Sequence, residues 1–166
     1  MSPNIMIIIA SAFIPFIIAM VWFNKNLFGG EKWHLMSDMS AEKAASPIKP
    51  IKLVLSLILN VFLAFGMFLF SIHETGVFGM VGGDLELMKT GTAAAFLSEY
   101  GGNFHTLTHG IVHGIAATMY FVFPILGYVT IFEKKSGKYF LVYLSYWLIT
   151  LVLMSIVICL WGASTI

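Results

Sequence analysis

Three histidines stand four residues apart in the second half of the chain: His105, His109 and His113 in the stretch HTLTHGIVHG. Residues four apart on an α-helix rise about 6 Å and rotate by about 40°, so these side chains follow one side of a helix. Two imidazoles at this spacing can chelate a transition metal. The same ladder could hold a haem against a histidine from another helix, or pass protons within a membrane.

Further ionisable residues lie where neighbouring segments would meet the ladder. His73 and Glu74 follow the apolar segment 51–72, and Glu99 comes shortly before His105. Successive spans cross a membrane in opposite directions, so the end of segment 51–72 should reach the level of His105. We therefore predict a transition-metal or haem site whose ligands come from His73, Glu74, Glu99, His105, His109 and His113, with the cofactor itself unknown.

The ladder also has a purely structural interpretation. Gly110 and Gly114 form a Gly-x-x-x-Gly step, which lets two membrane helices approach closely, and histidines beside such a step can hydrogen-bond across the contact. Gly66 is a further small residue, and Asn60 is a polar group that should bond to a neighbouring helix. These four residues are predicted to pack helices against each other, a second copy or a partner.

The composition indicates what kind of protein carries these residues. The chain has 166 residues, of which 59% are hydrophobic and only 10% are charged, whereas a soluble domain has roughly a quarter charged residues. All nine basic residues are lysines, so the bidentate arginine clamp for phosphate is missing and nucleic-acid binding is not expected. The single cysteine, Cys159, excludes an intramolecular disulfide. The chain is predicted to be an integral membrane protein in contact with lipid.

Spanning the hydrocarbon layer takes about 20 apolar residues, which must be helical to satisfy their backbone groups. The segments of sufficient length are residues 4–23, 51–72, 105–132 and 139–161. They predict an all-α fold: one transmembrane domain, residues 1–166, with four helices in one bundle. The connections are loops 24–50, 73–104 and 133–138. Pro15 and Pro124 are expected to kink the first and third helices.

Lysines predict the orientation, because loops rich in lysine remain in the cytoplasm. Loop 24–50 and its edges carry Lys25, Lys32, Lys43, Lys49 and Lys52, and loop 133–138 carries Lys134, Lys135 and Lys138. Loop 73–104 has only Lys89, against Glu74, Asp84, Glu86 and Glu99. Both termini and loop 73–104 are therefore expected outside, an N-out/C-out arrangement, with loops 24–50 and 133–138 in the cytoplasm.

Two stretches resemble the signatures of a known family. They are VWFNKNLFGGEKW at residues 21–33 and IFEKKSGKYFLVYLSYWLITLVLMSIVICLW at residues 131–161. They are similar to the first-loop and last-helix patterns of a domain-of-unknown-function family of small bacterial membrane proteins with four predicted spans. The segment around His109 and His113 resembles the third helix of that family. The resemblance covers most of the chain and implies the bacterial inner membrane, with loop 73–104 in the periplasm. It implies no activity, cofactor or catalytic residue.

Three functional hypotheses remain open at the level of sequence. The first is a non-catalytic subunit or accessory protein of a larger membrane complex, which would pack against other subunits or itself. The second is a membrane protein that binds a metal or haem at the periplasmic side through the histidines, for redox chemistry or metal handling. The third is a small ion or proton transporter. No arrangement of a soluble-type hydrolase or transferase is recognisable, so an enzymatic role is not expected.

Overall fold

The structure, a computed structural model, describes residues 2–24, 40, 42–43 and 46–164. Within these residues four helical segments are long and apolar enough to cross a membrane, as predicted: Ile5–Trp22, Pro50–Ser71, Leu107–Phe132 and Gly137–Trp161. The all-α, four-span fold class is thereby confirmed. Most of the first-loop signature at residues 21–33, and His34 after it, lie outside the described residues.

The first span is interrupted near its middle. It consists of α1 (Ile5–Ser11) and α2 (Phe13–Trp22), which meet at Ala12. Pro15 has no N–H to donate to the carbonyl of Ser11, so the regular hydrogen-bond ladder cannot continue through this point. The break therefore follows directly from the position of the proline.

The third span also changes its geometry next to a proline. It consists of α8 (Leu107–Ala117), the π-helical turn η2 (Thr118–Val122) and α9 (Phe123–Phe132). Pro124 cannot donate to the carbonyl of Tyr120, which lies inside η2. A π-helical turn locally widens the helix and is often found at functional sites.

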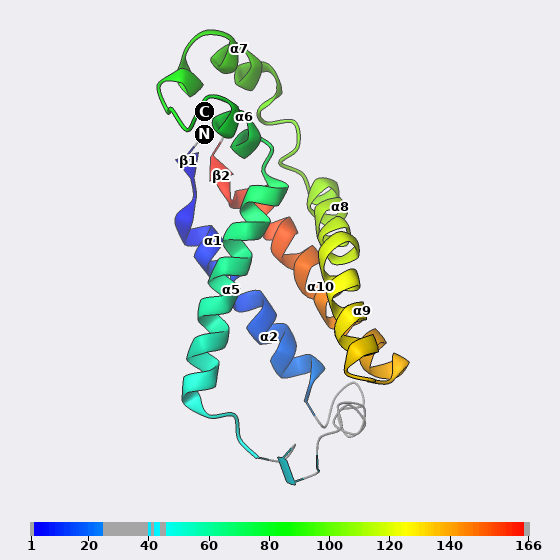
Figure 1. Cartoon of the computed structure of the whole chain (residues 1–166). Coiled ribbons are helices and arrows are strands. Elements are labelled where there is room, and N and C mark those ends of the chain that lie inside the picture. Colours follow the sequence, from blue (N-terminus) through cyan, green and yellow to red (C-terminus); the bar gives the residue numbers. More distant parts are fainter. Residues whose placement is uncertain (1, 25–39, 41, 44–45, 165–166) are drawn as a thin grey trace.

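The remaining helices are regular, and short elements cap one end of the bundle. The other spans are α5 (Pro50–Ser71) and α10 (Gly137–Trp161). Between α5 and α8 come α6 (Glu74–Met80), the 3₁₀ turn η1 (Leu87–Lys89) and α7 (Gly91–Tyr100). Two-residue strands β1 (Ser2–Pro3) and β2 (Ala163–Ser164) pair antiparallel. Both termini, α6 and α7 thus lie at the same end of the bundle (Figure 1).

Helix α10 is the centre of the bundle and contacts α1, α2, α5, α8 and α9. Figure 1 shows it between α5 on one side and α8 and α9 on the other. The buried apolar core that these helices share includes Ile8, Ala12, Ala64, Met67, Phe68, Ala117, Leu151, Met154 and Ile158. Large apolar side chains on the outer faces remain exposed, such as Phe62 at 73%. Outward apolar side chains are what a protein surrounded by hydrocarbon requires.

Candidate metal centre

Glycines hold α8 directly against α10. A Cβ atom added to Gly110 would lie 2.6 Å from the Cα of Ile156, and one added to Gly114 would lie 2.4 Å from the Cα of Val152. These distances are far shorter than any contact between real carbon atoms, so only glycine permits this backbone approach. The small face of α8 is therefore covered by α10 of the same chain. The histidines of α8 lie at other positions around the helix.

A buried serine pair holds the end of α5 against the same part of α10. The Oγ atoms of Ser71 and Ser155 lie 3.0 Å apart, and both residues are buried. Ser155 is next to Ile156, the residue that contacts Gly110. Adjacent positions of α10 therefore contact α5 and α8. These two contacts fix the distance between His73, which follows α5, and the histidines of α8.

Three histidines converge between the end of α5 and α8. One ligand nitrogen from each of His73, His109 and His113 lies within 4.8 Å of the other two. The Nε2 atoms of His73 and His113 are 3.2 Å apart, and the ring centroids of His109 and His113 are 4.3 Å apart. We call these three residues the histidine cluster. Two of them come from the ladder and the third comes from a separate helix end.

Two aromatic side chains lie against the cluster, in which His73 is exposed and the other two histidines are half-buried. The ring of Phe104 lies 5.0 Å from that of His73 and 5.1 Å from that of His109, and Phe70 meets His113 edge-on at 5.0 Å. Nε2 of His109 and Nδ1 of His113 are buried and have no hydrogen-bond partner among the described residues. Such unsatisfied buried nitrogens are unusual and are explained if a ligand binds them.

The separations suit a small metal ion. Zinc–nitrogen bonds are about 2.0–2.1 Å long, so two ligands of a tetrahedral ion are about 3.3 Å apart. The Nε2 atoms of His73 and His113, 3.2 Å apart, are already close to this separation. The ligand nitrogen of His109 lies within 4.8 Å of the other two, so only a small inward movement of its side chain would complete the site. Three imidazoles leave one tetrahedral position open, as in catalytic rather than structural zinc sites.

His105 lies before the start of α8, outside the helix predicted to begin with it, and takes part in a different interaction from His109 and His113. Its Nε2 atom lies 2.9 Å from Oε1 of Glu74, and the two side chains are only 12% and 9% exposed. The contact has the length of an ion pair, but Nε2 makes no aligned hydrogen bond. Neither residue belongs to the histidine cluster. The predicted ligands His105 and Glu74 therefore pair with each other and are not part of the histidine cluster.

The other predicted residues lie apart from the cluster. Glu99 is exposed on α7, where its carboxylate accepts a hydrogen bond and raises the pKa of the neighbouring Tyr100 hydroxyl. Asn60 is 9% exposed on α5. A Cβ at Gly66 would meet no atom within 4 Å, so no close helix contact requires this glycine.

Sequence reasoning missed the aromatic neighbours of the cluster. Phe70 stands three residues before His73, one helical turn away, and Phe104 directly precedes the ladder. That spacing is a usable signal, but it does not single out these two positions, because apolar residues are frequent throughout this chain.

Comparison with known proteins identifies a family for most of the chain. No curated protein and no solved structure matches it. A family model described as "Protein of unknown function (DUF1761)" matches residues 6–159, which include the histidine cluster and nearly all of the four spans. The resemblance to a family of unknown function is thereby confirmed, and the chain belongs to the DUF1761 family.

Proposed function

We propose that this multi-pass membrane protein binds a transition-metal ion through His73, His109 and His113. The observation that carries the proposal is the convergence of three imidazole nitrogens within 4.8 Å, one from the turn between α5 and α6 and two from α8. Ionisable residues within spanning helices are costly and generally functional. Helix packing alone would need a single hydrogen bond, whereas here a third imidazole points into the same small volume.

The donor set favours some metals over others. Imidazole suits zinc, copper, nickel and iron, whereas magnesium and calcium prefer oxygen ligands. The described part of the chain has no carboxylate in the histidine cluster. Nε2 of His73 lies only 3.2 Å from Nε2 of His113, which suits two ligands on the same ion better than axial ligands on opposite faces of a haem. We expect zinc or copper, with the fourth position taken by water or a small ligand.

We propose that the histidine cluster lies on the periplasmic side of the membrane of a bacterial cell. His73 directly precedes α6, and His109 lies near the start of α8. The histidine cluster is therefore near the end of the bundle that carries α6, α7 and both termini (Figure 1). Lys49 and Lys52 begin α5, and Lys134 and Lys135 follow α9, so these charges lie at the opposite end. By the positive-inside rule the lysine end is cytoplasmic.

The test is multi-element mass spectrometry of gently purified protein, with His109→Ala as the variant and His105→Ala as its matched control. Both substitutions remove an imidazole from the same ladder, but only His109 belongs to the histidine cluster. We expect near-stoichiometric metal in the wild type and in His105→Ala, and a loss of at least tenfold in His109→Ala. Equal metal content in all three proteins, or none in any after zinc or copper loading, would overturn the proposal.

A role as an accessory subunit of a larger membrane complex is the second candidate. Several apolar side chains are exposed in the segment between the second and third spans: Met80 81%, Leu85 56%, Leu87 50% and Phe96 49%. Exposed apolar side chains outside the spans are expected to face a partner or the membrane surface. Native co-purification of one stoichiometric partner, lost in the double variant Met80→Ser/Phe96→Ser, would support this role. A solitary protein in mild detergent would count against it.

A further inference from the structure

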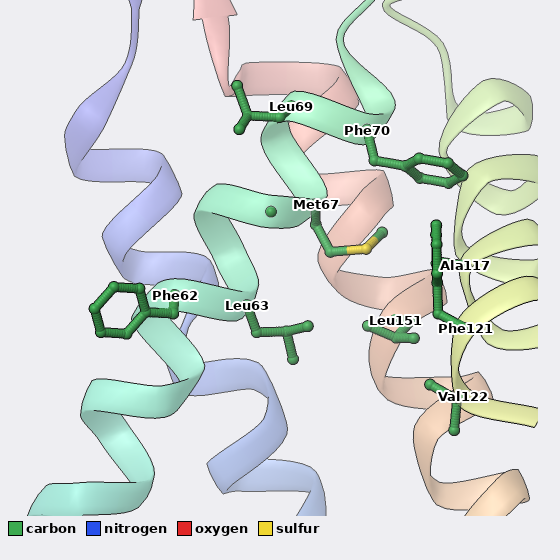
Figure 2. A pocket seen from close by; sticks show the side chains of 10 residues that line it. Phe62, Leu63, Met67, Leu69, Phe70, Ala117, Phe121, Val122 and Leu151 are labelled. Atoms are coloured by element: carbon green, nitrogen blue, oxygen red, sulfur yellow. The ribbon is translucent and has the colours of Figure 1, made fainter. Parts of the chain in front are cut away.

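An apolar cavity of about 750 Å³ lies between α5 and the third span. Its lining is Phe62, Leu63, Gly66, Met67, Leu69, Phe70, Ala117, Phe121, Val122 and Leu151. Figure 2 shows side chains of α5 opposite Phe121 and Val122, with Leu151 of α10 between them. The volume falls within the range of about 300–1,000 Å³ that is typical of small-molecule sites.

The cavity is reached from the lipid phase. Three of its lining residues are largely exposed on the outer, lipid-facing surface: Phe62 at 73%, Leu69 at 64% and Phe121 at 52%. The π-helical turn η2 contributes Phe121 and Val122 to the opposite wall. A ligand of this cavity is therefore soluble in the bilayer, and its buried part is apolar.

The histidine cluster stands at one end of the cavity. Phe70 lines the cavity, and its ring contacts both His113, at 5.0 Å, and Phe121, at 5.5 Å. Along the third span His109, His113, Ala117 and Phe121 follow at intervals of four residues, so the ladder continues into the cavity wall. A molecule in the cavity can place one end beside the imidazoles, where Nδ1 of His113 has no partner among the described residues.

Charge determines what kind of head group fits that end. The residues that line the cavity are all uncharged. Next to the histidine cluster, the buried Glu74 interacts electrostatically with His109 and would repel an anion. Lys89, the lysine of the segment between the second and third spans, is exposed and pairs with Glu86. Among the described residues no lysine lines the cavity, so a phosphate or carboxylate head would find no cation in its wall. A carbonyl or hydroxyl can instead bond to imidazole or to a bound metal. Phe70 and Phe104 beside the imidazoles favour a flat ring.

We propose that the cavity binds a membrane-soluble quinone: a neutral ring with carbonyl oxygens at the histidine cluster and an apolar tail between α5 and the third span. This inference deepens the proposed function, because it names the ligand class that approaches the metal site. The cavity itself needs no metal to hold the tail, so the two proposals can fail separately.

The test is native mass spectrometry of detergent-solubilised protein with decylubiquinone, which has a quinone ring and a ten-carbon tail. Gly66→Leu fills the cavity, and its first side-chain carbon meets no atom within 4 Å. The matched control is Gly79→Leu on α6, where a Cβ also meets no atom within 4 Å. We expect one bound decylubiquinone in the wild type and in Gly79→Leu, and at least tenfold weaker binding in Gly66→Leu. The metal content should be the same in all three.

A second pair of variants covers the case in which Gly66→Leu does not fold. Leu63→Phe narrows the cavity, and Leu55→Phe places the same change on α5 outside its lining. Oleate and phosphatidylglycerol serve as anionic competitors. The inference is overturned if neither cavity variant weakens the binding of decylubiquinone. It is also overturned if the two anionic lipids bind in the same place as well as decylubiquinone does. If decylubiquinone still binds after the metal is removed, the quinone inference stands. The proposed function is then judged from the metal content alone.

Discussion

Nε2 of His73 lies 3.2 Å from Nε2 of His113, although the two residues are 40 positions apart in the sequence. The contact joins the end of α5 to α8. As a hydrogen bond it uses one N–H and one nitrogen lone pair, whereas a metal ion would use a lone pair from each ring. Packing and metal binding therefore make different demands on the same two atoms.

A double-mutant cycle with His73→Ala and His113→Ala separates the two roles. In metal-free protein the coupling should be about 0.6 kcal/mol, a usual value for a hydrogen bond between membrane helices. With zinc at about 100 times its dissociation constant, the wild type should gain about 2.7 kcal/mol that the variants lack. Unfolding in mixed detergents measures both. A coupling that zinc does not change would assign the contact to packing alone.

Gly114→Ala should disrupt the contact between α8 and α10. The added carbon would lie 2.4 Å from the Cα of Val152, a backbone atom that cannot move without shifting the helix. We expect a loss of about 1–3 kcal/mol of stability, together with weaker metal binding. Gly66→Ala is the matched control: its Cβ meets nothing within 4 Å, and alanine favours the helix by up to about 1 kcal/mol. Similar melting temperatures for the two variants would contradict the packing described.

Glu74→Gln should destabilise the protein without removing its metal. The Glu74 side chain is 9% exposed and lies 2.9 Å from His105, so its replacement leaves a buried contact incomplete at a cost of about 1–3 kcal/mol. Glu86→Gln removes the exposed partner of Lys89 and should have no measurable effect, as is common for surface pairs. Metal analysis and thermal unfolding of both variants test this. Loss of metal in Glu74→Gln alone would make Glu74 a ligand.

The orientation can be tested by cysteine labelling, because the native Cys159 is fully buried and should not react. Ser98 is exposed on α7, and Glu133 is exposed after α9. In intact bacterial cells an impermeant maleimide should label Ser98→Cys and should label Glu133→Cys only after the membrane is permeabilised. The opposite pattern would place the histidine cluster in the cytoplasm and reverse the proposed arrangement.

The sequence by itself determined the fold class. Apolar stretches of about 20 residues with few charges have one stable form in hydrocarbon, the helix, and this depends only on local composition. The prolines gave the positions of irregularity, since Pro15 and Pro124 each leave one carbonyl without its helical partner. The four-residue spacing also placed His109 and His113 on one side of α8, as a matter of geometry, whereas His105 lies just before the helix begins at Leu107.

Only the tertiary structure decided which of these histidines meet. His73 joins His109 and His113, while His105, on the same ladder, lies against Glu74. That division depends on how α5 and α8 lie on α10, through the Ser71–Ser155 contact across 84 residues and through the glycines against Ile156 and Val152. Helix periodicity specifies which side chains share a face. It does not specify the depth and rotation at which two faces meet, because these depend on close packing between distant parts of the chain.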